Sequence, residues 1–204
     1  MKRIILSEGR NDTIFLKELL TRKMDFEEDK IIFFDQNSQD NKKNQKNLED
    51  KFFSKLETEW EGHRLLLLVK SEGGKDNIIA INESRFRYFC EKRHDPIILI
   101  DLDNKPMEIF IDKLDKKLTN TFKGINLTTK SCELETIDDA TIHSMKLFKN
   151  NNHIGTIYLI GFYQSLEHVT GINDEHNDDQ KKSISEEYIK KSQIHKIFRL
   201  AFNE

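Results

Sequence analysis

The sequence has few of the residues that define several common classes of protein. It contains two cysteines, two prolines and eight glycines among 204 residues. The two cysteines, Cys90 and Cys132, provide no disulfide framework, so we expect a reducing compartment and a cytoplasmic location. The scarcity of proline and glycine excludes a collagen-like or linker-rich chain.

Long hydrophobic runs and an excess of one charge are also missing. The first apolar run, Ile4–Leu6, is too short for a signal peptide, and no run approaches the length needed to cross a bilayer. We therefore expect no membrane association. Lys and Arg number 33 against 36 Asp and Glu, a net charge of −3. No global positive field indicates nucleic acid, and a polyanionic partner would need a local basic patch.

Hydrophobic residues make up 36% of the chain and are gathered in short runs. These runs lack polar alternation, which is typical of strands buried on both faces of a parallel sheet. Segments of helical periodicity lie between them, and this alternation predicts an α/β fold with a doubly wound, mainly parallel sheet covered by helices on both faces. The predicted strands are 3–7, 31–34, 65–69, 96–101 and 154–162, with an exposed or edge strand at 125–135.

Polar residues at the starts of periodic segments predict where two of the helices begin. Asn11 or Asp12 can cap the first helix, and Asn104 can cap a helix that starts near Pro106. The other predicted helices are 48–60, 75–91, 136–150 and 184–202, and the predicted loops are 35–47 and 171–182. We expect a core at 1–120 and an α/β C-terminal elaboration at 121–204 packed on it, together forming a single domain.

The strongest chemical signal is a buried strand that ends in two aspartates, Asp101 and Asp103, separated by one leucine. Alternation along a strand would place both on one face, about 7 Å apart. Carboxylates this close repel each other unless a cation lies between them or one keeps its proton. Mg²⁺ and Mn²⁺, which prefer oxygen ligands, suit such a pair. The alternative is a strand that ends in a solvated acidic turn.

Unusual residues follow two further predicted strands at the same edge of the sheet. Glu8 and Gly9 follow the first strand, and the pair at 73–74 follows the third. In an open parallel sheet, ligands bind beyond the carboxyl ends of the strands. We therefore expect Glu8 to lie close enough to Asp101 and Asp103 to share a cation with them.

In this order, the motifs resemble the Toprim family, the module shared by topoisomerases, bacterial primases, small maturation ribonucleases and overcoming-lysogenization-defect nucleases. The matching stretches are 4–16, with an apolar strand that ends in Glu8 and Gly9, and 97–103, with an apolar strand that ends in Asp-Leu-Asp. The turn at 73–77 is similar to a glycine-containing turn that many members carry. The resemblance covers roughly residues 1–120.

The resemblance implies a Rossmann-like Toprim fold and a metal-dependent nuclease, or another phosphodiester-cleaving enzyme, that acts on DNA or RNA. It implies that Asp101 and Asp103 hold Mg²⁺ or Mn²⁺ and that Glu8 shares the metal or acts as general acid/base. Asp12 is a candidate further ligand, with helix capping as the alternative. The candidate contacts to the phosphates of a nucleic acid are Gly9, Gly73, Gly74 and Lys75.

Other functions stay open at this point. Topoisomerases add a nucleophilic tyrosine domain and primases add zinc-binding and polymerase parts, and the sequence fits neither. A stand-alone module could instead bind a metal-nucleotide or a protein partner without catalysis, or act as the effector subunit of a two-protein defence system. The turn at 73–75 is not a phosphate-binding P-loop, because the earlier glycine is missing and Asp76 replaces Ser or Thr.

Two further groups of residues carry weaker signals. An acidic and histidine-containing segment could form a metal cluster, but its spacing matches no ligand pattern and favours a solvated loop; it comprises His168, Asp174, Glu175, His176, Asp178 and Asp179. The best local basic patches for a nucleic-acid backbone, for which solvated surface is the favoured alternative, are Lys42, Lys43, Lys46, Arg85, Arg87, Lys92 and Arg93.

Overall fold

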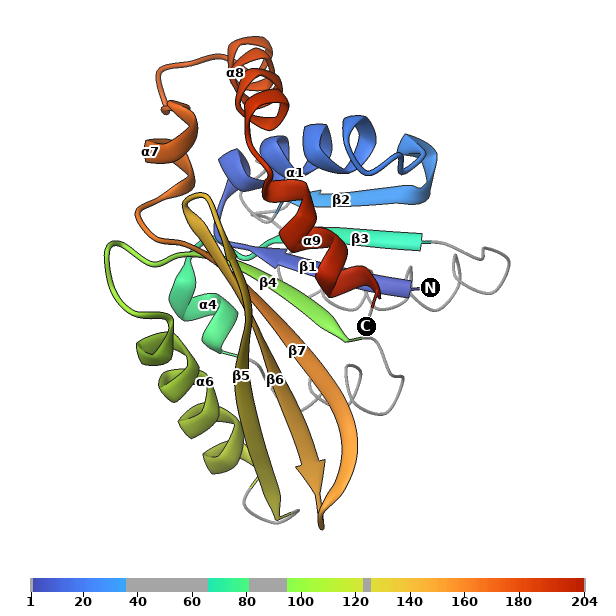
Figure 1. Ribbon diagram of the computed structural model, residues 1–204, viewed down its shortest axis with the longest axis vertical. Helices are drawn as coiled ribbons and strands as arrows, with labels where there is room; N and C mark the ends of the chain where they lie inside the picture. The colour runs from blue at the N-terminus through green and yellow to red at the C-terminus, as the bar shows by residue number, and fades with distance from the viewer. Residues whose placement is uncertain (1, 36–65, 81–94, 123–125, 204) are drawn as a thin grey trace, which may run out of the picture.

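The structure, a computed structural model, describes residues 2–35, 66–80, 95–122 and 126–203. These residues form a seven-stranded sheet with the strand order β2-β3-β1-β4-β7-β6-β5 (Figure 1). The strands are β1 (Lys2–Ser7), β2 (Ile31–Asp35), β3 (Leu66–Ser71), β4 (Pro96–Asp101), β5 (Leu127–Ile137), β6 (Ala140–Lys149) and β7 (Asn152–Phe162).

The sheet is mostly parallel. β1 lies between β3 and β4 and is parallel to both, β2 is parallel to β3, and β7 is parallel to β4. β6 and β5 then extend the sheet as antiparallel strands. The α/β class and the mainly parallel, Rossmann-like sheet are confirmed, and β5 is an edge strand as predicted.

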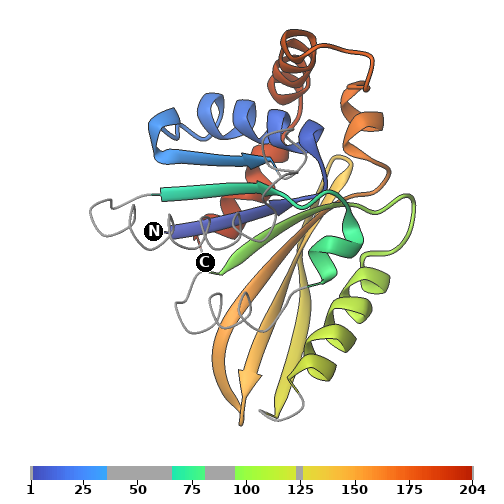
Figure 2. The ribbon, with the colours of Figure 1, turned by 180° about the vertical axis from the view of Figure 1, so that it is seen from behind.

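Helices cover both faces of the sheet (Figures 1 and 2). One face packs against α4 (Lys75–Ile79) and α6 (Met107–Thr121), and the other against α1 (Arg10–Arg22), α7 (Leu166–Thr170), α8 (Asp178–Lys191) and α9 (Ile194–Asn203). A short 3₁₀ turn, η1 (Glu28–Lys30), precedes β2. Side chains of β4 alternate between the two cores: Ile98 and Ile100 face α6, and Ile97 and Leu99 face the opposite core. This double burial explains the uninterrupted apolar runs of the sequence.

Several predictions fall on residues outside the described ranges. The helix at 48–60, the loop from residue 36 to 47 and all seven residues of the basic patches lie there. Of the helix predicted at 75–91, the structure describes α4 and then Ala80, which is not helical.

The helix predicted at 136–150 is wrong, because this segment forms the end of β5, a turn and the strand β6. Asp138, with φ of 53°, lies in the turn between the two strands. β6 pairs with β5 on one side and β7 on the other, and six consecutive residues from Ala140 to Met145 are buried. A strand buried on both faces has no polar face, so its sequence lacks the alternation that would identify a strand.

The C-terminal predictions also need correction. The single helix predicted at 184–202 is two helices, α8 and α9, separated at Ser192 and Gln193. The Gln193 backbone N–H donates a 2.7 Å hydrogen bond to the Asp138 carboxylate, which fixes this break against the β5–β6 turn. The segment predicted as loop at 171–182 includes the start of α8, where the side chain of Asn177 accepts a hydrogen bond from the Gln180 backbone. Asn104 does not cap α6, which begins after Pro106.

Gly161 of β7 offers a test of the packing between the sheet and α6. It lies opposite Ile100 of β4, and a Cβ atom there would approach the Met107 Cε atom to 2.7 Å and the Leu102 Cγ atom to 2.9 Å. We expect Gly161→Ala to lower the free energy of unfolding by about 1–3 kcal/mol, measured by urea denaturation. Combining it with Met107→Ala should cost less than the sum of the two single changes, because the clash with Met107 is removed while that with Leu102 remains. Additive costs would contradict this packing.

Candidate functional site

The candidate site lies at the edge of the sheet where β1, β3 and β4 end. Glu8 directly follows β1, and Asp101 is the last residue of β4. The Glu8 Oε1 atom accepts a 2.8 Å hydrogen bond from the backbone N–H of Asp101. The structure therefore brings together the acidic residue of the first strand and the first aspartate of the fourth.

Lys75 connects Glu8 to the second aspartate. Its Nζ atom lies 2.5 Å from the Asp103 Oδ2 atom and 3.7 Å from the Glu8 Oε1 atom. Because β4 ends at Asp101, Asp103 does not lie on a strand face; it lies in the following turn with φ of 51° and is exposed. The prediction that strand alternation aligns Asp101 with Asp103 is wrong, and it is the turn that directs Asp103 towards Lys75.

Backbone hydrogen bonds hold this turn against the segment that follows β7. The N–H groups of Leu102, Asp103 and Asn104 donate to the carbonyls of Phe162, Gln164 and Tyr163 at 2.8, 2.9 and 2.6 Å. In addition, the Asp101 Oδ1 atom accepts a 2.8 Å hydrogen bond from the backbone N–H at the start of α7, Leu166. The acidic residues after β4 are thus held in place by the C-terminal half of the chain.

Asp12 lies in the first turn of α1 and is 5% exposed. Its Oδ2 atom accepts a 2.8 Å hydrogen bond from the backbone N–H of Gly9, the residue that precedes α1. Asp12 therefore stabilises the start of the helix from within it, whereas the predicted position of the cap, Asn11 or Asp12, is wrong. Glycine is required in the turn after β3, where Gly73 and Gly74 have φ of 75° and 132°.

The carboxyl groups of Glu8, Asp12 and Asp101 hold their protons more tightly than usual. Burial, opposed by the Asp101 hydrogen bond and by Lys75, raises the pKa of Glu8 from 4.5 to about 7. Burial also raises the pKa of Asp101 from 3.8 to about 6, with a further increase from the charge of Glu167. Burial and the charge of Asp101 raise the pKa of Asp12. Negative charge is therefore poorly accommodated here, and a cation would be attracted.

A cavity of about 450 Å³, which we call the acidic hollow, opens in front of these groups. It is lined by Glu8, Gly9, Arg10, Asn11, Asp12, Gly73, Gly74, Asp101, Glu167, Asp174 and Lys181. The Asn11 Nδ2 atom donates hydrogen bonds to the Glu167 Oε1 atom at 3.0 Å and the Asp174 Oδ1 atom at 3.3 Å. The wall of the hollow thus combines the residues after β1 with the segment from α7 to α8.

Sequence reasoning missed most of this C-terminal wall. Glu167 and Lys181 lie in α7 and in a part of α8 that were not predicted as helix. Asp174 had been considered only as part of an acidic and histidine-containing segment. Its neighbour Asp178 forms a 2.6 Å ion pair with Arg10 instead of joining a metal cluster. The buried residues of 166–181 are Leu166, Ile172 and Lys181, which follow no regular spacing, so periodicity gives no signal for this wall.

Lys181 is the most unusual member of the wall. It is 7% exposed, and its ammonium group has no ion pair or hydrogen bond with another residue in the part of the chain that the structure describes. Its ammonium nitrogen is not among the buried polar atoms without a partner, so the stem is buried while the charged end reaches the acidic hollow. In the acidic hollow, Lys181 is therefore available to an anionic group of a ligand.

The oxygen-only donors of Glu8, Asp101 and Asp103 fit a hard divalent cation such as Mg²⁺ or Mn²⁺ in chemistry. In their present positions they do not form a coordination group. Within residues 2–35, 66–80, 95–122 and 126–203, no three His, Cys, Asp or Glu side chains are arranged to hold a metal ion. Lys75 bridges Glu8 and Asp103 with its own positive charge. The metal site stays a prediction.

Comparisons with known proteins do not place the chain in a family. No family model, no curated protein and no solved structure matches it. The resemblance to the Toprim family therefore rests on the motifs around Glu8 and Asp101 and stays a prediction. Among the described residues, no helix combines the length and apolarity that crossing a membrane requires.

Proposed function

We propose that the protein is a Toprim-type enzyme that cleaves phosphodiester bonds of DNA or RNA with Mg²⁺ or Mn²⁺. The observation that carries this proposal is the environment of Glu8. Its carboxyl group, with a pKa raised to about 7, is hydrogen-bonded to the backbone of Asp101 and contacted by Lys75 at the carboxyl edge of a parallel sheet. A group that titrates near neutral pH is suited to general acid/base catalysis.

The side chains of the site have separate roles in this proposal. Asp101 and Asp103 would hold the metal, with Asp12 as a candidate further ligand, and Glu8 would either share the metal or act as general acid/base. A bound Mg²⁺ or Mn²⁺ supplies charge neutralisation at the phosphodiester and a lowered pKa of water. In the general acid/base role, Glu8 would pass its proton to the leaving oxygen.

Phosphate binding would come from the cationic and glycine residues around these acids. Lys75 at the start of α4 and the buried Lys181 of α8 are the cations that can contact phosphate oxygens. Gly73 and Gly74 present backbone without side chains, so a phosphate group can approach the turn closely. Gly9 precedes α1 next to the same hollow and allows the same approach there.

A non-catalytic binding module is the second candidate. The observation in its favour is that Lys75 contacts both Glu8 and Asp103, so their charges are partly balanced without a metal. Such a site could bind a nucleotide or an anionic segment of a protein partner through Lys75 and Lys181. This candidate predicts binding without turnover.

Cleavage of end-labelled single- and double-stranded DNA and RNA by the purified protein distinguishes the two candidates. The proposal predicts products with Mn²⁺ or Mg²⁺ and none with EDTA. Asp101→Asn keeps an oxygen that can accept the Leu166 N–H, and we expect it to lower the cleavage rate by about tenfold or more. The control is Asp112→Asn, an exposed residue of α6. If the wild-type protein binds a nucleotide but cleaves none of these nucleic acids with either metal, the result supports the binding module and contradicts the enzyme.

A further inference from the structure

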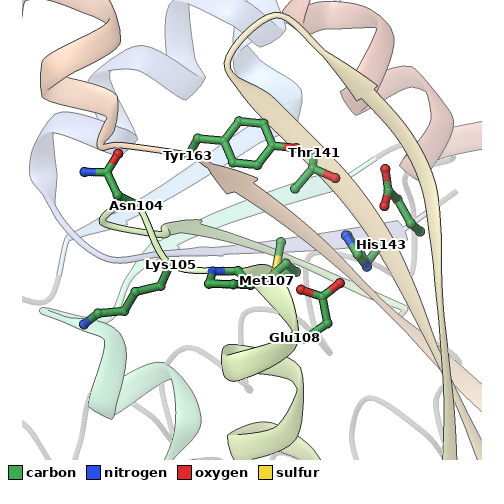
Figure 3. A pocket seen from close by; sticks show the side chains of 9 residues that line it. Asn104, Lys105, Met107, Glu108, Thr141, His143 and Tyr163 are labelled. Atoms are coloured by element: carbon green, nitrogen blue, oxygen red, sulfur yellow. The ribbon is translucent and has the colours of Figure 1, made fainter.

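A second cavity lies on the other side of the turn that carries Asp103. This cavity of about 430 Å³, which we call the side hollow, is formed by the turn, the start of α6 and the strands β5 and β6. Figure 3 shows Asn104 and Lys105 at one end, Tyr163 and Thr141 along one side, and Glu108 and His143 opposite. Its volume lies in the range of small-ligand sites. The function proposed above makes no use of it.

His143 is the buried polar group of the side hollow. It is 5% exposed, and its imidazole has no hydrogen bond with another residue of the described ranges. Burial lowers its pKa, opposed by the charges of Glu133 and Glu108. A neutral imidazole offers one donor and one acceptor, and a buried group of this kind without partners leaves both to a ligand. Glu133 lies opposite His143 across the β5–β6 pair, on the same face of the sheet.

Tyr163 provides an exposed aromatic ring at the edge of the side hollow. The residue is 42% exposed, yet its backbone is fixed on both sides. Its N–H donates to the Asp139 carbonyl at 2.8 Å, and its carbonyl accepts the Asn104 N–H at 2.6 Å. An exposed ring on a rigid backbone loses little conformational entropy on binding and is suited to stacking on a flat ligand.

The charged residues that line the side hollow determine which flat ligand it can bind. Glu108 and Glu133 are acceptors that favour amino groups and disfavour phosphate inside the cavity. Lys105 is the lining cation and belongs to the turn next to the acidic hollow. A nucleotide would therefore place its base inside, on Tyr163, and its phosphate outside, towards Lys105. Carboxylates pair well with the exocyclic amino group of cytosine.

We propose that the side hollow binds one unpaired nucleobase of a single-stranded nucleic acid and prefers a base with an exocyclic amino group, such as cytosine. This inference rests on the proposed function, because the base bound in the side hollow would be the one next to the phosphodiester bound at the acidic hollow. The two hollows are connected along the chain: Asp101, the last residue of β4, lines the acidic hollow, and the turn that follows it carries Asn104 and Lys105, which line the side hollow. The substrate class that follows is single-stranded DNA or RNA, since a base within a duplex cannot enter the cavity.

The test measures binding separately from cleavage. Fluorescence anisotropy with labelled oligocytidine and oligouridine hexamers in EDTA reports affinity without metal-dependent turnover. We expect oligocytidine to bind several-fold more tightly. Tyr163→Ala should weaken binding of oligocytidine about tenfold, because it removes the aromatic face on which the base stacks. The control is Ile109→Ala, a similarly exposed apolar residue of α6 that does not line the side hollow.

A second pair of variants tests the base preference. Glu108→Leu combined with Glu133→Leu removes both acceptors and should abolish the preference for oligocytidine, whereas Glu135→Leu on the same strand, outside the hollow, should keep it. Circular dichroism confirms that each variant is folded. An unchanged preference in the double variant, unchanged affinity in Tyr163→Ala, or no binding of either hexamer would overturn the inference.

Cleavage by the wild-type protein separates this inference from the proposed function. If the wild type cleaves RNA or DNA but Tyr163→Ala leaves KM unchanged, the side hollow is not the base site and the enzyme proposal stands. If the hexamers bind with the expected preference and no cleavage occurs with Mn²⁺, the base site stands and the enzyme proposal fails.

Discussion

The Glu8→Gln variant should be more stable than the wild type at pH 8 and should have lost almost all metal-dependent cleavage. Gln is uncharged and keeps an oxygen that can accept the Asp101 N–H, so it preserves the hydrogen bond and removes the buried charge. Burial of the Glu8 carboxylate is the main cause of its raised pKa. The substitution therefore separates the effect of the Glu8 charge on the stability of the fold from its effect on catalysis.

The pH dependence gives the sign of the effect. The folded protein holds the Glu8 proton up to about pH 7, whereas the unfolded chain releases it near 4.5. Between these values the folded state binds more protons, so the free energy of unfolding of the wild type falls as the pH rises. Above pH 7 the full cost remains, which is about 3 kcal/mol for a pKa change of this size and less to the extent that solvent screens this partly exposed group. The variant lacks this cost, so the stability difference should be large at pH 8 and vanish below about pH 4.5.

Urea denaturation at pH 4, 6 and 8 measures this difference. In the same preparations, loss of a general acid is expected to lower the cleavage rate by about 10²–10⁴-fold. Asp112→Asn on the exposed face of α6 serves as the control for both measurements. A Glu8→Gln protein that is less stable at pH 8, or that cleaves at the wild-type rate, would contradict the assignment.

The sequence predicted the central sheet because its strands are buried on both faces. The strands β1, β2, β3, β4 and β7 each contain an uninterrupted apolar run of three residues or more, and short apolar runs between helical segments are typical of buried parallel strands. Burial on both faces is also the reason that the prediction at β6 was wrong. There, Thr141, His143 and Ser144 are buried polar residues, and polar residues within an apolar segment imitate helical periodicity.

The sequence predicted the position of those site residues that lie at the ends of parallel strands. Glu8 and Asp101 are neighbours because β1 and β4 are, and neighbouring parallel strands end at one edge. The position of Asp103 depends on a left-handed turn, and that of Lys181 depends on α8 packing against α1. Neither is encoded in local periodicity, because both depend on contacts between segments distant in the sequence.

The stability cost of the acids is consistent with a functional site. Buried carboxyl groups with raised pKa values, such as Glu8 and Asp101, weaken the folded state at neutral pH. A purely structural role would be served better by amides, which accept the same backbone hydrogen bonds without a charge. Two such destabilising carboxyl groups lie side by side in this site, and a concentration of unfavourable groups in one place indicates selection for a function and not for stability.

Asp12→Asn and Asp12→Ala together should show whether Asp12 acts through its charge or only through its hydrogen bond to Gly9. Asn keeps an acceptor for the Gly9 N–H and removes a buried charge, so we expect the free energy of unfolding at pH 8 to rise by about 1–3 kcal/mol. Ala removes the acceptor as well and should be about 1 kcal/mol less stable than Asn. Because the raised pKa favours the protonated wild type in acid, the advantage of Asn should shrink as the pH falls.

Titration with Mn²⁺, followed by electron paramagnetic resonance, decides between the two roles of Asp12. If Asp12 is a metal ligand, both variants should bind Mn²⁺ at least about tenfold more weakly than the wild type. If it only stabilises the start of α1, Asn should bind Mn²⁺ as the wild type does, or more weakly by no more than the loss of one nearby charge. Weak binding by Ala alone would assign the effect to the Gly9 contact, since that hydrogen bond is what Asn retains and Ala lacks.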